Sequence, residues 1–286
     1  MNPDRLERIG WALLLLHILV SLFGLVGIAV MVPNPALWSG STLGASLFPA
    51  AVQHGGNGQI LLGAAAALAF GAATVGRRAT VIFFLVSVLL SLLLEFTGTS
   101  WGWPFGNYEY TEMFGFKLLG KVPPAIPLSW FFMGFASFAL ASALIRKWRG
   151  RAGLWPSILL GAMLLTTWDF VLDPAMSQDR LALQYWIWED VGPYMGVPLV
   201  NFVGWLGTGA VFMFAASRFD ERLRPIQVEQ DVFFLLLYLC NLLFAVGICM
   251  ANHLWLPAAI GGLVTGLVLA GWFASGFGAP RLSEGV

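Results

Sequence analysis

Three acidic residues lie at the ends of long apolar runs, where an ionisable side chain is costly to place. Glu95 closes one run, and Asp169 and Asp173 close another. Asp169 and Asp173 are four residues apart, so a helix puts both carboxyl groups on one face. Ionisable groups inside such runs usually serve function. A carboxyl group in apolar surroundings can hold a proton near neutral pH and donate it. We therefore predict that these three residues are catalytic.

Within this set, Asp169 lies one helical turn deeper than Asp173, and Pro174 is expected to end the helix. Asp169 is therefore predicted to be the best shielded from water and to act as the proton donor. Glu95 and Asp173, nearer water, are expected to orient a nucleophile and accept its proton. The alternative is that all three are interfacial acids bonded to loop amides.

Two long connections, 96–124 and 174–196, follow these acids. Connections of this length usually have a function. The first holds eight aromatic residues, with glycines at 98, 102 and 106. It is expected to fold back as an aromatic lid, or alternatively to lie at the depth of the lipid headgroups. The predicted substrate-binding residues, drawn from this segment and from the neighbouring helices, are Trp101, Trp103, Phe105, Asn107, Tyr108, Trp168, Asn201 and Trp205.

The remaining polar residues within apolar runs are less informative. Asn201 lies one turn inside its run with Trp205 four residues later on the same face. Asn201 can therefore serve a site or join two helices. His17, Asn241 and His253 are interpreted as packing or capping groups.

Missing motifs narrow the chemistry further. The three histidines form no HxxH or HxxxH pair, and GxGxxG, GxxxxGK[ST] and GxSxG are all absent. The sequence thus offers neither a histidine-rich metal cage nor a nucleotide site, and we expect no metal and no cofactor. Carboxyl groups, amides and aromatic rings suit proton chemistry on an apolar molecule.

Composition then defines the elements that position these residues. Of 286 residues, 10% are charged and 58% are hydrophobic, and the mean hydropathy is +0.79. These values exclude a soluble or disordered chain, and a net charge of zero offers no basic surface for nucleic acid. We predict one all-α transmembrane domain over residues 1–286, with a catalytic core at 80–215. The eight predicted spans are 10–32, 58–76, 79–95, 125–145, 153–173, 197–217, 231–250 and 253–275.

Positive charge predicts the orientation of this bundle. Twelve of the fifteen Lys and Arg residues fall on the side of the termini, and three (Lys117, Lys121 and Arg180) fall on the other. Cytoplasmic loops carry the excess of positive charge. Both termini are therefore predicted to be cytoplasmic, in a multi-pass protein of the inner or plasma membrane.

Four blocks resemble a known family. They are EFTGTSWGWPFGNY at 95–108, IPLSW at 126–130, WDFVLDP at 168–174 and VPLVNFVGWL at 197–206. In this order they resemble the CruF-type carotenoid hydratases of bacteria and archaea. The resemblance covers residues 80–215 well and the flanks by hydropathy alone.

The resemblance implies addition of water across the C1′,C2′ double bond of a linear (ψ) carotenoid end, which gives a tertiary alcohol. The implied substrates are γ-carotene-like or acyclic C40 or C50 carotenoids in the lipid bilayer, and other enzymes of the pathway are possible partners. Two alternatives stay open. A carotenoid end-group cyclase forms a similar cation but excludes water. A proton-coupled transporter or lipid carrier uses buried acids as relays.

Overall fold

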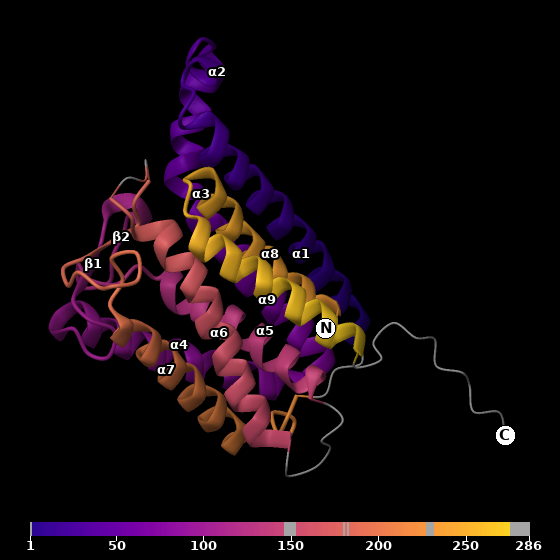
Figure 1. Ribbon diagram of the computed structural model, residues 1–286. Coiled ribbons are helices and arrows are strands. Elements are labelled where there is room, and N and C mark those ends of the chain that lie inside the picture. The colour runs from indigo at the N-terminus through magenta and orange to yellow at the C-terminus, as the bar shows by residue number, and fades with distance from the viewer. Residues whose placement is uncertain (1, 146–152, 180, 182, 227–231, 275–286) are drawn as a thin grey trace.

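The computed structural model describes residues 2–145, 153–179, 181, 183–226 and 232–274. Within them the chain is a bundle of long helices (Figure 1), which confirms the predicted all-α class. The long helices are α1 (Pro3–Val26), α3 (Thr42–Gly71), α4 (Arg77–Trp101), α5 (Ala125–Leu144), α6 (Leu154–Ser177), α7 (Leu199–Phe219), α8 (Val232–Ala251) and α9 (Trp255–Ala274). The shorter elements are α2 (Ala36–Ser39), a 3₁₀ turn at Glu112–Phe114, and π-helical turns at Gly27–Met31 and Ala72–Gly76.

Seven helical stretches of the described chain are long and apolar enough to cross a membrane. One of them, Thr42–Trp101, has 60 residues and would measure about 90 Å as a single helix. It contains both α3 and α4, because Gly76 has φ +114° and interrupts it. That backbone conformation favours glycine. The break turns one stretch into two helices, so the described part of the chain has eight long helices, as predicted from sequence.

The largest boundary error is at the start of α3, and the end of α6 also differs from the prediction. Helix α3 begins at Thr42 instead of 58, and α6 continues through Pro174 to Ser177. The connections predicted at 96–124 and 174–196 are therefore shorter, because α4 also continues to Trp101. Pro174 cannot donate to the carbonyl of Phe170. The Tyr194 hydroxyl donates to that carbonyl instead, at 2.8 Å, and so satisfies the acceptor that the proline leaves free.

The last two apolar runs form separate helices. Helix α8 ends at Ala251 and α9 begins at Trp255, and the two pack against each other. Both cysteines, Cys240 and Cys249, lie in α8 and are unbonded. This agrees with the sequence, which places them too far apart on one helix for a disulfide.

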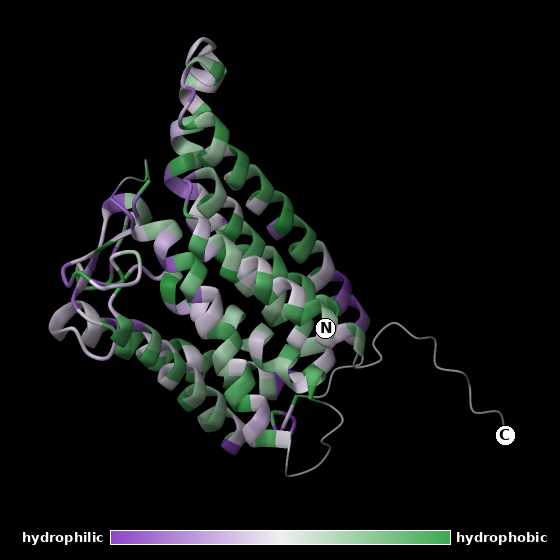
Figure 2. Cartoon of the chain, viewed as in Figure 1, coloured by the Kyte–Doolittle hydropathy of each residue, from purple (hydrophilic) through white to green (hydrophobic). Residues whose placement is uncertain are grey.

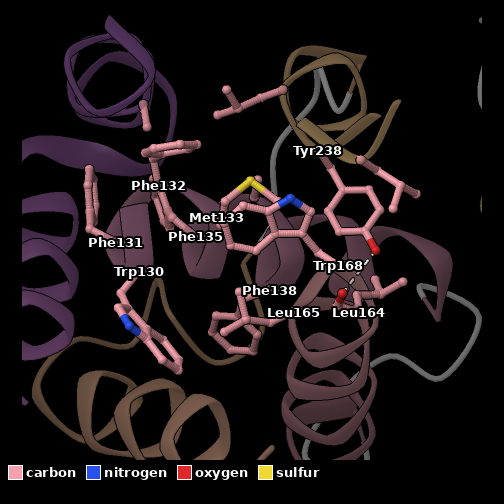
Figure 3. Close-up of a cluster of buried hydrophobic side chains, with 14 of the residues drawn as sticks. Trp130, Phe131, Phe132, Met133, Phe135, Phe138, Leu164, Leu165, Trp168 and Tyr238 are labelled. Atoms are coloured by element: carbon pink, nitrogen blue, oxygen red, sulfur yellow. Dashed lines mark hydrogen bonds between the residues drawn. The ribbon is translucent and has the colours of Figure 1, made fainter. Parts of the chain in front are cut away.

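Helix α5 forms the centre of the bundle, and nearly every one of its side chains is buried. Figure 3 shows aromatic rings of α5, among them Trp130 and Phe132, beside Trp168 of α6 and Tyr238 of α8. The Tyr238 hydroxyl donates to the carbonyl of Leu164 at 2.9 Å, so this deeply buried polar group is satisfied.

The outer surface of the helices is apolar, as Figure 2 shows by its hydrophobic colouring. Leu15, Leu19, Leu89, Leu93 and other large apolar side chains are more than half exposed. Such a surface suits lipid and not water. These features support a multi-pass membrane protein. The cations at 146–151, Arg180 and Arg281, which the orientation argument uses, lie outside the described residues.

A two-stranded antiparallel ribbon lies at the end of the bundle away from the N-terminus (Figure 1). Its strands are β1 (Tyr108–Tyr110) and β2 (Trp186–Trp188). They come from the two long connections that follow α4 and α6, so the ribbon joins them into one cover over the helix ends.

Candidate functional site

The ribbon points four aromatic side chains inward. In its register Tyr108 pairs with Trp188 and Tyr110 with Trp186. Residues two apart on a strand point to the same side, and paired residues share a face. The ring centroids of Tyr108 and Trp188 are 5.0 Å apart, and those of Tyr110 and Trp186 are 6.3 Å apart. The ribbon therefore presents two hydroxyls and two indole N–H groups to the carboxyl groups beneath it.

Glu95 of α4 receives three of the hydrogen bonds at the site. Its Oε2 accepts from the hydroxyls of Tyr110, at 2.7 Å, and Tyr108. Its Oε1 accepts from the indole nitrogen of Trp130 on α5, at 2.8 Å. Burial, then the nearby negative charge of Glu95, raises the pKa of both tyrosines well above the usual value. Both hydroxyls thus remain protonated and available as donors to Glu95.

Asp173 of α6 is also held by three donors. The indole nitrogens of Trp186 and Trp188 both donate to its Oδ1 at 2.8 Å. Asn201 of α7 bridges the two aspartates through Nδ2, which lies 2.8 Å from Oδ2 of Asp173 and 2.7 Å from Oδ2 of Asp169. One amide group therefore uses both of its hydrogens on the carboxyl pair.

The three carboxyl groups differ in whether both of their oxygens accept hydrogen bonds. Five of the six carboxyl oxygens accept hydrogen bonds from described side chains. The sixth, Oδ1 of Asp169, accepts none from the described part of the chain. Asp169 lines the cavity beside the site. It is therefore the carboxyl group with an oxygen left to meet a ligand.

The predicted difference in exposure among the acids is wrong. Glu95 is 3% exposed, and Asp169 and Asp173 are each 1% exposed. The ribbon covers Asp173 as fully as the helices enclose Asp169, which the span boundaries alone do not reveal. The number of donors, and not the depth, distinguishes the three groups.

Next to the carboxyl groups lies a cluster of aromatic rings. Trp205 of α7 stacks on Trp130 with 3.8 Å between centroids and 20° between planes. Trp168 meets Trp205 edge-to-face at 5.8 Å, and Phe105 lies 5.9 Å from Trp130. These four rings line the same cavity as the carboxyl groups. They surround an apolar ligand with π faces that can stabilise a cation.

A cavity of about 220 Å³ joins these groups. Its carboxyl end is formed by α4, α6, α7 and the ribbon. Its other end is formed by apolar side chains of α1, α3 and α8, such as Phe23, Ile60 and Phe244. No group of three or more His, Cys, Asp or Glu side chains among the described residues is arranged to hold a metal ion. The wall of the cavity is thus mostly apolar, with the three carboxyl groups on one part of it.

The structure places five of the eight predicted binding residues in this cavity: Phe105, Tyr108, Trp168, Asn201 and Trp205. The other three lie elsewhere. Trp101 and Trp103 are 78% and 64% exposed. Asn107 bonds to the exposed Asp190, at 2.9 Å through its side chain and 2.8 Å through its backbone N–H. These three do not line the cavity, and substrate binding by them stays a prediction.

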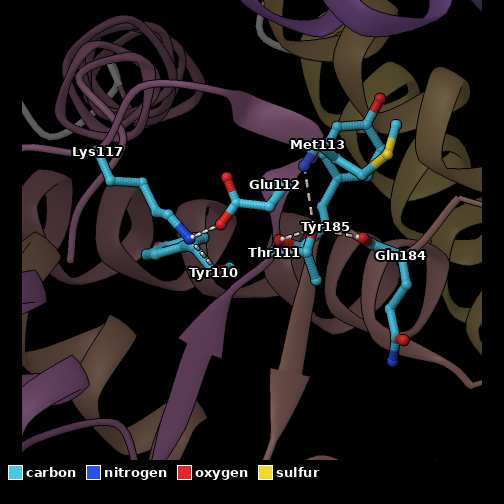
Figure 4. A network of polar contacts seen from close by, with 7 residues as sticks. All are labelled: Tyr110, Thr111, Glu112, Met113, Lys117, Gln184 and Tyr185. Atoms are coloured by element: carbon cyan, nitrogen blue, oxygen red, sulfur yellow. Dashed lines mark hydrogen bonds and ion pairs between the residues drawn. The ribbon is translucent and has the colours of Figure 1, made fainter. Parts of the chain in front are cut away.

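Further hydrogen bonds hold the two connections of the cover in place (Figure 4). Lys117 donates to the carbonyl of Tyr110 at 2.9 Å and to the carboxylate of Glu112 at 2.7 Å. Thr111 donates through its hydroxyl to the carbonyl of Gln184 at 2.7 Å and through its backbone N–H to Tyr185 at 3.0 Å. The two connections are therefore joined beyond the ribbon itself.

Four site residues are missing from the sequence-based list: Tyr110, Trp130, Trp186 and Trp188. Trp130 lies in the IPLSW block, and the other three lie in the two long connections. The alternation of YEY and WIW is the signal that could have found the ribbon, but three-residue strands are too short to stand out.

Comparisons with known proteins identify the family of this chain. Residues 55–268 match the family described as "Carotenoid biosynthesis protein". The chain is also 30% identical over 223 residues to a bisanhydrobacterioruberin hydratase of Haloarcula japonica, which covers 74% of this chain and 70% of that protein. No solved structure matches. The family match reaches well beyond the 80–215 core and includes the second half of α3, all of α8 and most of α9. The chain therefore belongs to the family of carotenoid biosynthesis proteins.

Proposed function

We propose that this protein hydrates the C1′,C2′ double bond of a linear (ψ) carotenoid end without a cofactor, from within the inner or plasma membrane. The observation that carries the proposal is the free Oδ1 of Asp169, in an otherwise fully bonded set of acids beside stacked indoles. The Haloarcula relative is a hydratase, which supports the same reaction class. The implied substrates are γ-carotene-like or acyclic carotenoids.

Asp169 is the proton donor in this mechanism. Donated hydrogen bonds favour a charged carboxylate, and Glu95 and Asp173 each accept three. Asp169 accepts one, from Asn201. It is therefore the group that carries the proton at lowest cost. Its free oxygen delivers that proton to C2′ of the alkene.

Protonation at C2′ leaves a tertiary cation at C1′. Trp205, Trp130, Trp168 and Phe105 supply π faces around it, each worth about 2 kcal/mol when water is excluded. Indole and phenyl rings do not trap the cation as an amine or thiol would. The rings thus stabilise a charge that exists only during the reaction, which is the condition for a faster step.

Water then attacks C1′ and loses one proton. Asp173 is held as a carboxylate by Trp186, Trp188 and Asn201, and it accepts that proton at Oδ2, which takes one hydrogen bond, from Asn201, and keeps a second lone pair. Transfer of a proton back to Asp169 restores the starting state, so the net change is addition of one water. Glu95 keeps a second negative charge near the cation.

A direct test is to express the chain in cells that accumulate lycopene or γ-carotene and to measure the pigment mass. Hydration adds the mass of one water per end, whereas cyclisation leaves the mass unchanged and transport alters no pigment. Pigment of unchanged mass, in cells that contain the folded protein, would refute the hydratase.

A further inference from the structure

A second polar cluster lies in the arm of the cavity that is formed by α1, α3 and α8. His17 of α1 is fully buried, and its ring lies between two amide residues. Its Nδ1 is 2.9 Å from the carbonyl of Gln59, and its Nε2 is 3.1 Å from Nδ2 of Asn241. Ser21 donates to the carbonyl of His17 at 2.7 Å. The proposed reaction uses none of these four residues.

The hydrogen bonds fix which way each amide points. A backbone carbonyl can only accept, so Nδ1 of His17 carries the hydrogen and Nε2 is the acceptor. Nδ2 of Asn241 therefore donates to Nε2 of His17 and, at 2.8 Å, to the carbonyl of Leu237. Nε2 of Gln59 donates to the hydroxyl oxygen of Ser21 at 3.0 Å. The nitrogen of each amide faces the network.

The side-chain oxygens of Asn241 and Gln59 take no part in this network. Neither Oδ1 of Asn241 nor Oε1 of Gln59 accepts a hydrogen bond from any described residue, although Asn241 is only 5% exposed. Both residues line the cavity. An amide oxygen in a cavity wall that lacks a donor can accept a hydrogen bond from a ligand. Val20, Phe23 and Phe244, which line the same cavity, are apolar and offer no donor.

We propose that Oδ1 of Asn241 and Oε1 of Gln59 form a subsite for an alcohol, which accepts the O–H of a hydroxylated linear isoprenoid. The choice of an isoprenoid rests on the proposed function, and the choice of an alcohol rests on the two acceptors. The ligand then occupies both ends of the cavity, with its alkene at Asp169 and its hydroxyl at this subsite. Lycopene and γ-carotene carry no hydroxyl group and would leave this subsite empty, whereas a substrate that already bears one would come from a hydration or an oxygenation.

The positions of Asn241 and Asp169 along their helices give the distance between the hydroxyl group and the alkene of a bound ligand. Asn241 lies nine residues after the start of α8, and Asp169 lies fifteen after the start of α6. At 1.5 Å per residue these are about 14 Å and 22 Å from the helix starts. The hydroxyl group therefore lies on the order of 10 Å from the reacting alkene.

Geraniol and geranyl methyl ether are a matched pair of probes. Each has a trisubstituted alkene near one end and an oxygen at the other, but the ether cannot donate a hydrogen bond. Their affinities for the purified full chain in lipid nanodiscs are measured by the change in tryptophan fluorescence. One neutral hydrogen bond should make geraniol bind about two- to tenfold more tightly. The ratio of the two affinities is the readout.

Gln59→Met should bring this ratio toward one, as should Asn241→Leu. Gln53→Met is the matched control on the same helix, since Gln53 is exposed and does not line the cavity, and it should leave the ratio unchanged. If Asn241→Leu does not fold, Gln59→Met decides alone. If the wild type binds both probes equally, or if neither variant lowers the ratio, the subsite is overturned. The two oxygens would then be bonded to water and not to a ligand. Because this is a binding measurement, failure of lycopene hydration would overturn the proposed function without changing the ratio.

Discussion

Replacing Asp169 by Asn removes the proposed proton while keeping the volume of the side chain. Asn201 must still donate to residue 169, so the new amide turns its oxygen to Asn201 and its NH₂ to the cavity. An amide there cannot protonate an alkene. General acid catalysis contributes about 10²–10⁴-fold, and an unactivated alkene needs the upper end. We expect a loss of about 10⁴-fold, or about 5 kcal/mol of transition-state stabilisation.

The assay is the rate of hydroxylated product from lycopene with purified protein, together with the amount of bound carotenoid. Asp169→Asn should abolish turnover and keep both the fold and the bound pigment. Asp179→Asn, an exposed aspartate on the same side of the bundle, is the matched control and should change little. Near-normal turnover in Asp169→Asn, with Glu95→Gln or Asp173→Asn inactive, would reverse the roles. Normal turnover in all three variants would exclude the site.

Three further predictions concern orientation, oxygen source and the aromatic rings. Topology reporters fused at Glu112 and Glu221 should give opposite signals because of the charge asymmetry; the same signal from both would refute the orientation. Product formed in H₂¹⁸O should carry ¹⁸O in its hydroxyl, and label arriving from ¹⁸O₂ would indicate an oxygenase. Trp205→Ala should lower kcat about 30-fold, the equivalent of about 2 kcal/mol of cation–π stabilisation, while Trp205→Phe recovers most of it. Trp101→Ala, on the exposed surface, should change kcat little, and equal losses in the two alanine variants would argue against a cation at the stacked rings.

The sequence predicted the helices and the acids because both depend on local signals. An apolar run of about 20 residues is long enough to span a membrane as a helix. An acidic residue within such a run can be recognised from the sequence alone. Glu95, Asp169 and Asp173 could thus be recognised without knowing what surrounds them. Asn201 was recognised in the same way, by its polarity one turn inside a span.

The partners of these acids could not be predicted, because they come from distant segments. Trp186 reaches Asp173 only through the pairing of β2 with β1, and no local pattern encodes that register. The exposed position of Trp101 could not be predicted, because a tryptophan near a span end looks the same in sequence whether it faces a cavity or the interface. The end of α6 was predicted too early, because Pro174 normally stops a helix. Here the Tyr194 hydroxyl, twenty residues later, donates to the carbonyl that the proline leaves without a partner.

The ribbon also determines by which route a ligand reaches the site. Lifting it away would strip Glu95 of two tyrosine donors and Asp173 of two indole donors at the same moment. Hydrogen bonds to charged groups contribute roughly 1.5–3 kcal/mol each, so opening this face would cost roughly 6–12 kcal/mol. The ribbon therefore stays closed over the site and does not open to admit a ligand. Phe23 lines the cavity and is also 64% exposed on the apolar face of α1. A carotenoid that never leaves the bilayer can thus slide in sideways from the lipid, with its reactive tip leading and its tail still in the membrane.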